Sequence, residues 1–249
     1  MPVFNDASME NHTIGGSNFG FSAKRVADLG ASEYTLVVIA ADATGSVYGF
    51  KNKIEEAVKA VVQSCRYSPR ADNLMLRFIT FNSSTGVKEV HGFKPLSECN
   101  LDSYTGTVEP RGNTNLFDAC YSAAGSLNQY GKELTEQDFG ANGLFVVITD
   151  GDDNASRTTP RMLREEIMKG VTGESLESTV SILVGVNVQD ARMANALQNF
   201  KAEAGFTQYL EIDNATDKTF AKLADFVSKS ISAASQALGT GGPSQALTF

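Results

Sequence analysis

Three short segments of the sequence concentrate hydroxyl and carboxylate side chains where a strand-like run ends or a helix-like pattern begins. Residues 42–46 read Asp-Ala-Thr-Gly-Ser, residues 112–116 read Gly-Asn-Thr-Asn-Leu, and residues 149–154 read Thr-Asp-Gly-Asp-Asp-Asn. Their side chains offer oxygen ligands only, and an all-oxygen site selects hard divalent ions such as Mg²⁺, Mn²⁺ or Ca²⁺. If the fold brings the three segments together, they indicate a divalent cation site.

Each segment also has a purely structural interpretation when it is taken alone. Asp, Ser and Thr before a helix are common N-caps, and Asp-Gly after a strand is a common turn. The combination of all three segments, each in a suitable strand or helix context, is what favours a shared site.

Cysteine and histidine usage argues against other kinds of metal or catalytic centre. Cys65, Cys99 and Cys120 form no CxxC pair, so they are predicted to be reduced, mostly buried thiols. His12 and His91 are far apart in sequence, and we expect no histidine-based site.

The elements that must position these segments alternate between strands and helices. Continuous apolar runs are typical of strands buried on both faces, and apolar residues spaced by three or four are typical of amphipathic helices. Strands are predicted over residues 34–41, 74–81, 87–91, 143–149, 180–186 and 208–212, and helices over residues 47–65, 116–129, 161–169, 190–203 and 216–234.

This alternation predicts an α/β fold of the Rossmann-like, doubly wound kind. We expect a mostly parallel six-stranded sheet with helices on both faces, and one antiparallel edge strand at residues 87–91 after a tight turn. In such sheets, ligands bind at the carboxyl ends of the strands, where residues 42–46 and 149–154 are expected to lie.

The predicted domain organisation is simple. Residues 1–32 are polar and glycine-containing, and are expected to form a loosely structured lead-in to one domain over residues 33–235. Residues 236–249 carry no charge and no periodicity, which predicts a flexible tail.

Five residues of the three segments match a known pattern. Asp42, Thr44 and Ser46 match Asp-x-Ser-x-Ser, Thr114 matches the threonine of a Gly-x-Thr-like loop, and Asp150 matches the aspartate of Thr-Asp-Gly. In these positions, and in its strand order over residues 33–235, the sequence resembles the von Willebrand factor A (VWA) domain family with its metal-ion-dependent adhesion site. Thr44 departs from the pattern, since serine is usual there, but its hydroxyl can still ligate.

The resemblance implies a non-enzymatic protein-binding adaptor. In it, Thr44, Ser46 and Thr114 would supply hydroxyl oxygens to Mg²⁺, with Mn²⁺ or Ca²⁺ as alternatives, and Asp42 and Asp150 would lie close by, partly acting through water. A coordination position left open would accept an Asp or Glu side chain of a protein partner. Family analogy points to a ring ATPase or a stress-response complex as that partner.

Further charged residues flank this pattern. Asp152 and Asp153 are expected to be solvated loop acids, or to contact a basic rim on a partner. Arg111 and Arg157 flank the expected site and could contact an acidic partner, although loop arginines commonly face water.

Two alternatives remain open from the sequence. Residues 42–45 also resemble the Asp-x-Thr-Gly segment of aspartyl-phosphate enzymes of the haloacid dehalogenase type, in which Asp42 would be the nucleophile of a Mg²⁺-dependent hydrolase. That family also needs a lysine-bearing loop, for which the sequence offers Arg111 instead. The second alternative is a structural or scaffold protein with the VWA fold and an unused site.

Charge and hydropathy exclude several other classes. A net charge of −8 and a pI near 4.9 argue against nucleic acid and anionic membranes as partners. No apolar run approaches the roughly 20 residues that span a bilayer. The first residues show no secretory signal and the cysteines no disulfide pattern, so a cytoplasmic location is expected.

Overall fold

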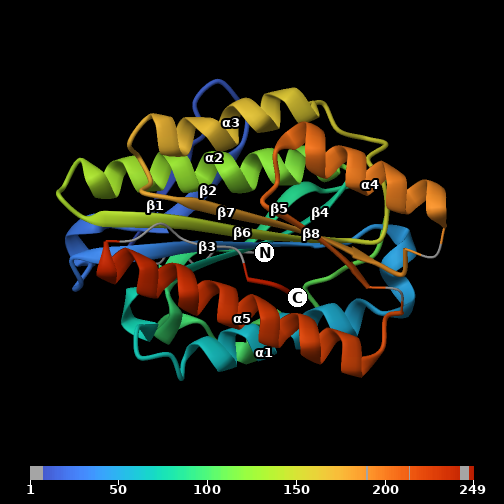
Figure 1. Ribbon diagram of the computed structural model, residues 1–249, viewed down its shortest axis with the longest axis horizontal. Coiled ribbons are helices and arrows are strands. Elements are labelled where there is room, and N and C mark those ends of the chain that lie inside the picture. The colour runs from blue at the N-terminus through green and yellow to red at the C-terminus, as the bar shows by residue number, and fades with distance from the viewer. Residues whose placement is uncertain (1–7, 189, 213, 242–246) are drawn as a thin grey trace.

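An eight-stranded sheet lies between two layers of helices in the computed structural model (Figure 1), which describes residues 8–188, 190–212, 214–241 and 247–249. The strand order is β1-β2-β5-β4-β3-β6-β7-β8. The strands are β1 (Met9–Thr13), β2 (Gly20–Lys24), β3 (Glu33–Asp42), β4 (Leu74–Asn82), β5 (Gly86–Pro95), β6 (Gly140–Thr149), β7 (Thr179–Val186) and β8 (Gln208–Ile212).

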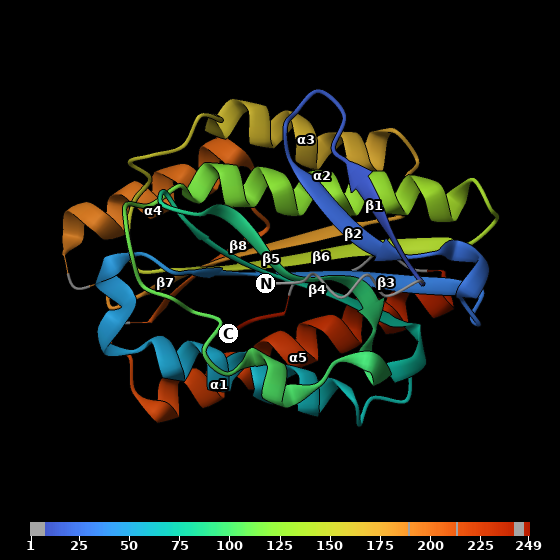
Figure 2. The same cartoon turned by 180° about the vertical axis from the view of Figure 1, so that it is seen from behind.

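Five α-helices cover the two faces of the sheet among the described residues. The pair α1 and α5 packs on one face, and α2, α3 and α4 pack on the other (Figures 1 and 2). The helices are α1 (Lys51–Cys65), α2 (Leu116–Thr135), α3 (Pro160–Thr172), α4 (Ala191–Ala204) and α5 (Asp217–Thr240). The predicted α/β class, with a mostly parallel sheet and helices on both faces, is confirmed.

Strand β3 shows why the central apolar run has no alternation. Val37 and Ile39 pack into the core under α1 and α5, whereas Leu36 and Val38 pack into the core under α2. Successive side chains of a strand point to opposite faces, so a strand covered on both faces must be apolar at every position.

The predicted strand number, six, is wrong, because β1 and β2 add two strands to the six expected ones. Strand β5 pairs antiparallel with β4 as predicted, but it is not an edge strand, since β2 pairs with its other side. The segment expected to be a loosely structured lead-in therefore extends the sheet. Its strands are only five residues long, and tertiary contacts bury Ile14 between them and Phe21 in β2.

An ion pair between a buried arginine and a partly exposed glutamate attaches this N-terminal hairpin to the sheet. The Arg77 side chain on β4 is 1% exposed and pairs with Glu89 of β5 at 2.7 Å. Glu89 in turn accepts a hydrogen bond of 2.7 Å from the Ser22 hydroxyl of β2. Close backbone contact needs glycine at position 92, because a Cβ there would collide with the Ser22 carbonyl oxygen.

The C-terminal region continues the fold beyond the predicted domain boundary. Helix α5 runs on to Thr240, into the segment predicted to be a flexible tail. Further along, the Phe249 ring packs edge-on against Phe226 with centroids 5.3 Å apart. Within the predicted tail, residues 242–246 lie outside the described residues.

The cysteines and the hydropathy of the helices were also the subject of predictions. Cys65, Cys99 and Cys120 are buried and free, as predicted. Within the described ranges, no helix combines the length and apolarity needed to cross a bilayer.

Candidate functional site

The three hydroxyl- and carboxylate-rich segments meet at the carboxyl edge of β3 and β6. These strands are parallel neighbours whose ends coincide, with Ala41 opposite Ile148. The loop before α2 joins them through backbone hydrogen bonds. The Arg111 N–H donates to the Ala43 carbonyl at 2.9 Å, and the Ala155 N–H donates to the Thr114 carbonyl at 3.0 Å. The sheet topology thus places the segments in one cluster.

Four of the five predicted site residues are linked in sequence order by three hydrogen bonds, one of them from a backbone N–H. An Asp42 oxygen accepts the Thr44 N–H at 2.8 Å, the Thr44 and Ser46 hydroxyls are 3.0 Å apart, and the Ser46 hydroxyl donates to Asp150 Oδ1 at 2.7 Å. The fifth residue, Thr114, lies beside the same loop, since a Cβ on Gly151 would be 3.5 Å from its hydroxyl.

Burial differs sharply within this cluster. Asp42 is fully buried and Thr44 and Thr114 are nearly so, whereas Ser46 is exposed and Asp150 is partly exposed. The cluster therefore has a buried floor and an open mouth, through which a ligand can approach Ser46 and Asp150 from solvent.

Burial makes negative charge costly at the floor of the site. It raises the pKa of Asp42 to about 6, although hydrogen bonds from Thr149 and Thr44 lower it, and repulsion by Asp150 raises it further. The pKa of Asp150 is also raised by burial, against the lowering effect of the Ser46 hydrogen bond. Two carboxylates thus lie near each other in a poorly solvated place, where a cation would stabilise their charged forms.

The raised pKa of Asp42 predicts a pH-dependent stability of the metal-free protein. The folded chain keeps a proton that the unfolded chain releases, so this contribution is fully present below the ordinary pKa near 3.8 and is lost as pH rises through about 6. In a chelator, wild type should lose roughly 2 kcal/mol relative to Asp42→Asn between about pH 4.5 and about pH 7.5. Urea unfolding of both proteins measures this difference, and parallel pH profiles would contradict it.

The donor set matches a small, hard cation in type and spacing. Neighbouring ligands around an octahedral Mg²⁺, at about 2.1 Å from the ion, are about 3 Å apart. The contacts from Thr44 to Ser46 and from Ser46 to Asp150, at 3.0 and 2.7 Å, have that spacing. In the described part of the chain, no group of three or more His, Cys, Asp or Glu residues could hold a metal ion. A cation here would depend on hydroxyls and two carboxylates.

Two residues of the segment 149–154 organise the site, although they were not among the five predicted site residues. The Thr149 hydroxyl donates to Asp42 Oδ2 at 2.6 Å, and Asn154 Oδ1 accepts the Thr114 N–H at 2.8 Å. Thr149 could have been found, because it precedes Asp150 at the end of a predicted strand. Asn154 acts on a residue far away in sequence and leaves no local signal.

Asp153 is not the solvated loop acid expected from its position. It accepts hydrogen bonds from the Phe117 N–H at 3.2 Å and the Ser156 hydroxyl at 2.5 Å, and so supports the first turn of α2. Asp152 is exposed, as expected for a loop acid. Of the two flanking arginines, Arg111 pairs with Glu109 and Arg157 is exposed at the rim.

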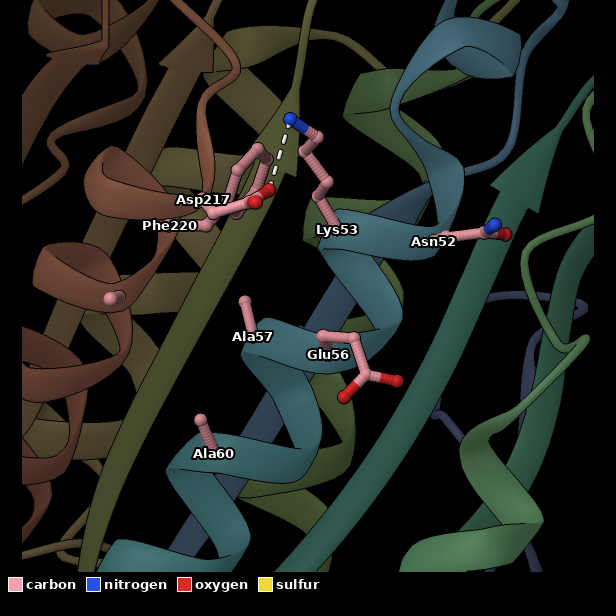
Figure 3. A pocket seen from close by; sticks show the side chains of 8 residues that line it. Asn52, Lys53, Glu56, Ala57, Ala60, Asp217 and Phe220 are labelled. Carbon is pink, nitrogen blue, oxygen red and sulfur yellow. Dashed lines mark ion pairs between the residues drawn. The ribbon is translucent and has the colours of Figure 1, made fainter.

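A separate cavity of about 500 Å³ lies between α1 and α5. Its lining includes Lys53, Ala57 and Phe220 (Figure 3). Lys53 pairs with Asp217 at 3.0 Å and links the start of α1 to the start of α5. None of the five predicted site residues lines this cavity.

At the level of sequence, the chain is similar to part of a known protein. No known family profile matches the sequence. A stretch of 138 residues is 22% identical to inter-alpha-trypsin inhibitor heavy chain H3 of Bos taurus, and covers 55% of this chain and 15% of that protein.

Solved structures are similar over most of the chain. The D319A mutant of the PilB minor pilin from Streptococcus sanguinis superposes with a TM-score of 0.58 at 14% identity, covering 88% of this chain and 66% of that one. The pilus adhesin SpaC from Lactobacillus rhamnosus GG, in its open conformation, gives 0.54 at 12% identity, covering 82% and 30%. The fold is VWA-like. The chain spans less than two thirds of each of these three proteins.

Proposed function

We propose that the protein is a non-enzymatic binding module that uses a divalent cation to capture a carboxylate of a protein partner. Thr44, Ser46 and Thr114 would hold the cation, Mg²⁺ in the first place, with Asp42 and Asp150 close by. The observation that carries the proposal is the chain of contacts from Asp42 to Asp150 at an open edge of the sheet.

The composition of the site supports capture rather than storage of a cation. Three neutral hydroxyls and two carboxylates leave a divalent charge less neutralised than a cage of carboxylates would. The exposed mouth beside Ser46 leaves room for a further oxygen ligand. An Asp or Glu side chain of a partner supplies both the oxygen and the negative charge.

The VWA-like fold suggests a protein-interaction module. We further propose that the partner presents Asp or Glu, with a ring ATPase or a stress-response complex as candidates. The setting that we propose is the cytoplasm. Nucleic acid and membranes are not proposed as partners, because the net charge is −8 and both surfaces attract basic proteins.

Burial of Asp42 weighs against the hydrolase alternative. A nucleophilic carboxylate must reach a phosphoryl group, but Asp42 is 0% exposed and both of its oxygens already accept hydrogen bonds. Whether the protein binds a divalent cation decides between the proposal and the alternative of an unused site.

A divalent cation that binds only the folded state should raise the melting temperature. With a Kd of about 1 mM, about 10 mM Mg²⁺ stabilises the fold by roughly 1.4 kcal/mol, which corresponds to a rise of roughly 3–6 °C for a domain of this size. Thermal melts in Mg²⁺, Mn²⁺, Ca²⁺ and NaCl of matched ionic strength measure this. A melting temperature unmoved by all three divalent ions would favour the unused-site alternative.

A further inference from the structure

A cavity of about 440 Å³ lies next to the candidate cation site, at the N-terminal end of α2. The tip of the N-terminal hairpin (residues 16–19), the β4–β5 turn and the segment after β6 form its walls. Asn115, which lines it, directly follows Thr114, and Ala155, which also lines it, donates its N–H to the Thr114 carbonyl at 3.0 Å. One partner could therefore reach both places.

Asp118, on the cavity lining, is a buried carboxylate that is satisfied on one side only. It is 8% exposed, and its Oδ1 accepts three hydrogen bonds, from the Arg157 N–H at 3.1 Å, the Thr158 N–H at 2.9 Å and the Thr158 hydroxyl at 2.9 Å. Within the described chain, no hydrogen bond reaches Oδ2. Oδ2 is not one of the buried atoms that lack a partner, so it is open to the cavity and free to accept from a ligand donor.

Asn115 contributes a second unsatisfied acceptor. It is 3% exposed, and its buried Oδ1 has no hydrogen-bond partner among the residues that the structure describes. Although it occupies the N-cap position of α2, its side chain makes no capping bond. The N–H groups that it would cap, those of Phe117 and Asp118, are taken by Asp153 and Ser156.

Part of the wall around these acceptors is aromatic and aliphatic. Phe19 and Tyr121 lie with ring centroids 6.0 Å apart, and Val87 and Met162 also line the cavity. Arg157 is on the lining as well, but its side chain is exposed. A cavity that combines these apolar side chains with the open carboxylate oxygen of Asp118 is complementary to a long side chain that ends in a cation.

We propose that this cavity binds an arginine side chain of the protein partner. A planar guanidinium can donate to Asp118 Oδ2 and stack on Phe19 or Tyr121, which the compact ammonium of lysine cannot do equally well. The net charge of −8 also favours a basic approach. Arginine binding itself needs no cation, whereas its coupling to a captured carboxylate rests on the proposed function.

An NMR titration with N-acetyl-arginine methylamide at millimolar concentrations, in a chelator, tests the proposal. We expect shifts of the Asn115 side-chain amide and of the Phe19 and Tyr121 ring signals. Asp118→Asn keeps the Oδ1 acceptor for residues 157 and 158 but replaces the unpaired oxygen by a donor. It should weaken binding roughly tenfold or more. Asp152→Asn, which removes an exposed charge off the cavity lining, should bind as wild type does.

Other outcomes overturn the assignment. Equal binding by wild type and Asp118→Asn, or no shift with the arginine probe, would contradict it. Equal or tighter binding of N-acetyl-leucine methylamide would make the cavity an apolar pocket, and the same shifts with acetate would make it an anion site. If Asp118→Asn does not fold, Phe19→Ala, which removes one wall, must weaken arginine binding.

The two proposals fail separately. Asp150→Asn should lose the melting response to Mg²⁺ but bind the arginine probe as wild type does. Arginine binding without any metal response would refute only the proposed function, and the reverse would refute only the arginine site.

Discussion

Asp150→Asn is expected to abolish Mg²⁺-dependent capture of the partner and the roughly 3–6 °C melting response, while the protein stays folded. Asparagine has nearly the same shape and can still accept the 2.7 Å hydrogen bond from Ser46. What it removes is one of the two carboxylates that attract a cation to the site. Because burial raises the pKa of Asp150, loss of its charge should not destabilise the metal-free fold.

The measurement compares immobilised wild type and Asp150→Asn in a host lysate, each with Mg²⁺ and with a chelator. Asp152→Asn is the matched control, since it removes the same charge from the same loop at an exposed position. Asp153 is unsuitable as a control, because it supports the start of α2. If Asp150→Asn retains the same Mg²⁺-dependent partners as wild type, the adhesion-site interpretation is wrong.

Arg77→Met should lower the free energy of unfolding by about 3–5 kcal/mol. The guanidinium is buried and donates to Glu89 at 2.7 Å and to the Ser126 hydroxyl at 3.1 Å. Its removal leaves Glu89 without its cation, and the Ser22 hydroxyl of the hairpin then hydrogen-bonds to an uncompensated charge.

Urea unfolding measures this loss, and hydrogen exchange shows where it acts. Because Glu89 joins β2 to the sheet, exchange should accelerate most in β1 and β2. The Arg77→Met/Glu89→Gln double variant should recover part of the stability, since no charge is then left unpaired. A loss below about 1 kcal/mol in the single variant would mean that the pair contributes no more than a surface ion pair does.

The central elements, and the meeting of residues 42–46 and 149–154 at one edge of the sheet, were predictable because their signals are local. A strand covered on both faces must be apolar throughout, as β3 is, and this identifies it without any knowledge of its neighbours. Asp42 and Thr149 end adjacent parallel strands. Their place at one edge of the sheet therefore followed from predicting the strands and the α/β class.

The N-terminal strands were missed for the opposite reason. Each is only five residues long, and what stabilises β2 is remote in sequence. Glu89 lies 67 residues from Ser22, to which it hydrogen-bonds, and the glycine that permits close approach is at position 92. Such contacts leave no pattern in the segment that they order.

By itself, then, the sequence determined the layered α/β class, the six strands β3–β8 with their five helices, and the three oxygen-rich segments, since residue type and periodicity encode all of these. The choice of Asp42, Thr44, Ser46, Thr114 and Asp150 within those segments came from the resemblance to the VWA pattern. Only the tertiary structure decided the depth at which Asp42 lies, the support of α2 by Asp153, and the cavity closed by the hairpin. Burial, pKa and cavity shape depend on which distant segments pack together, and that is a property of the assembled fold.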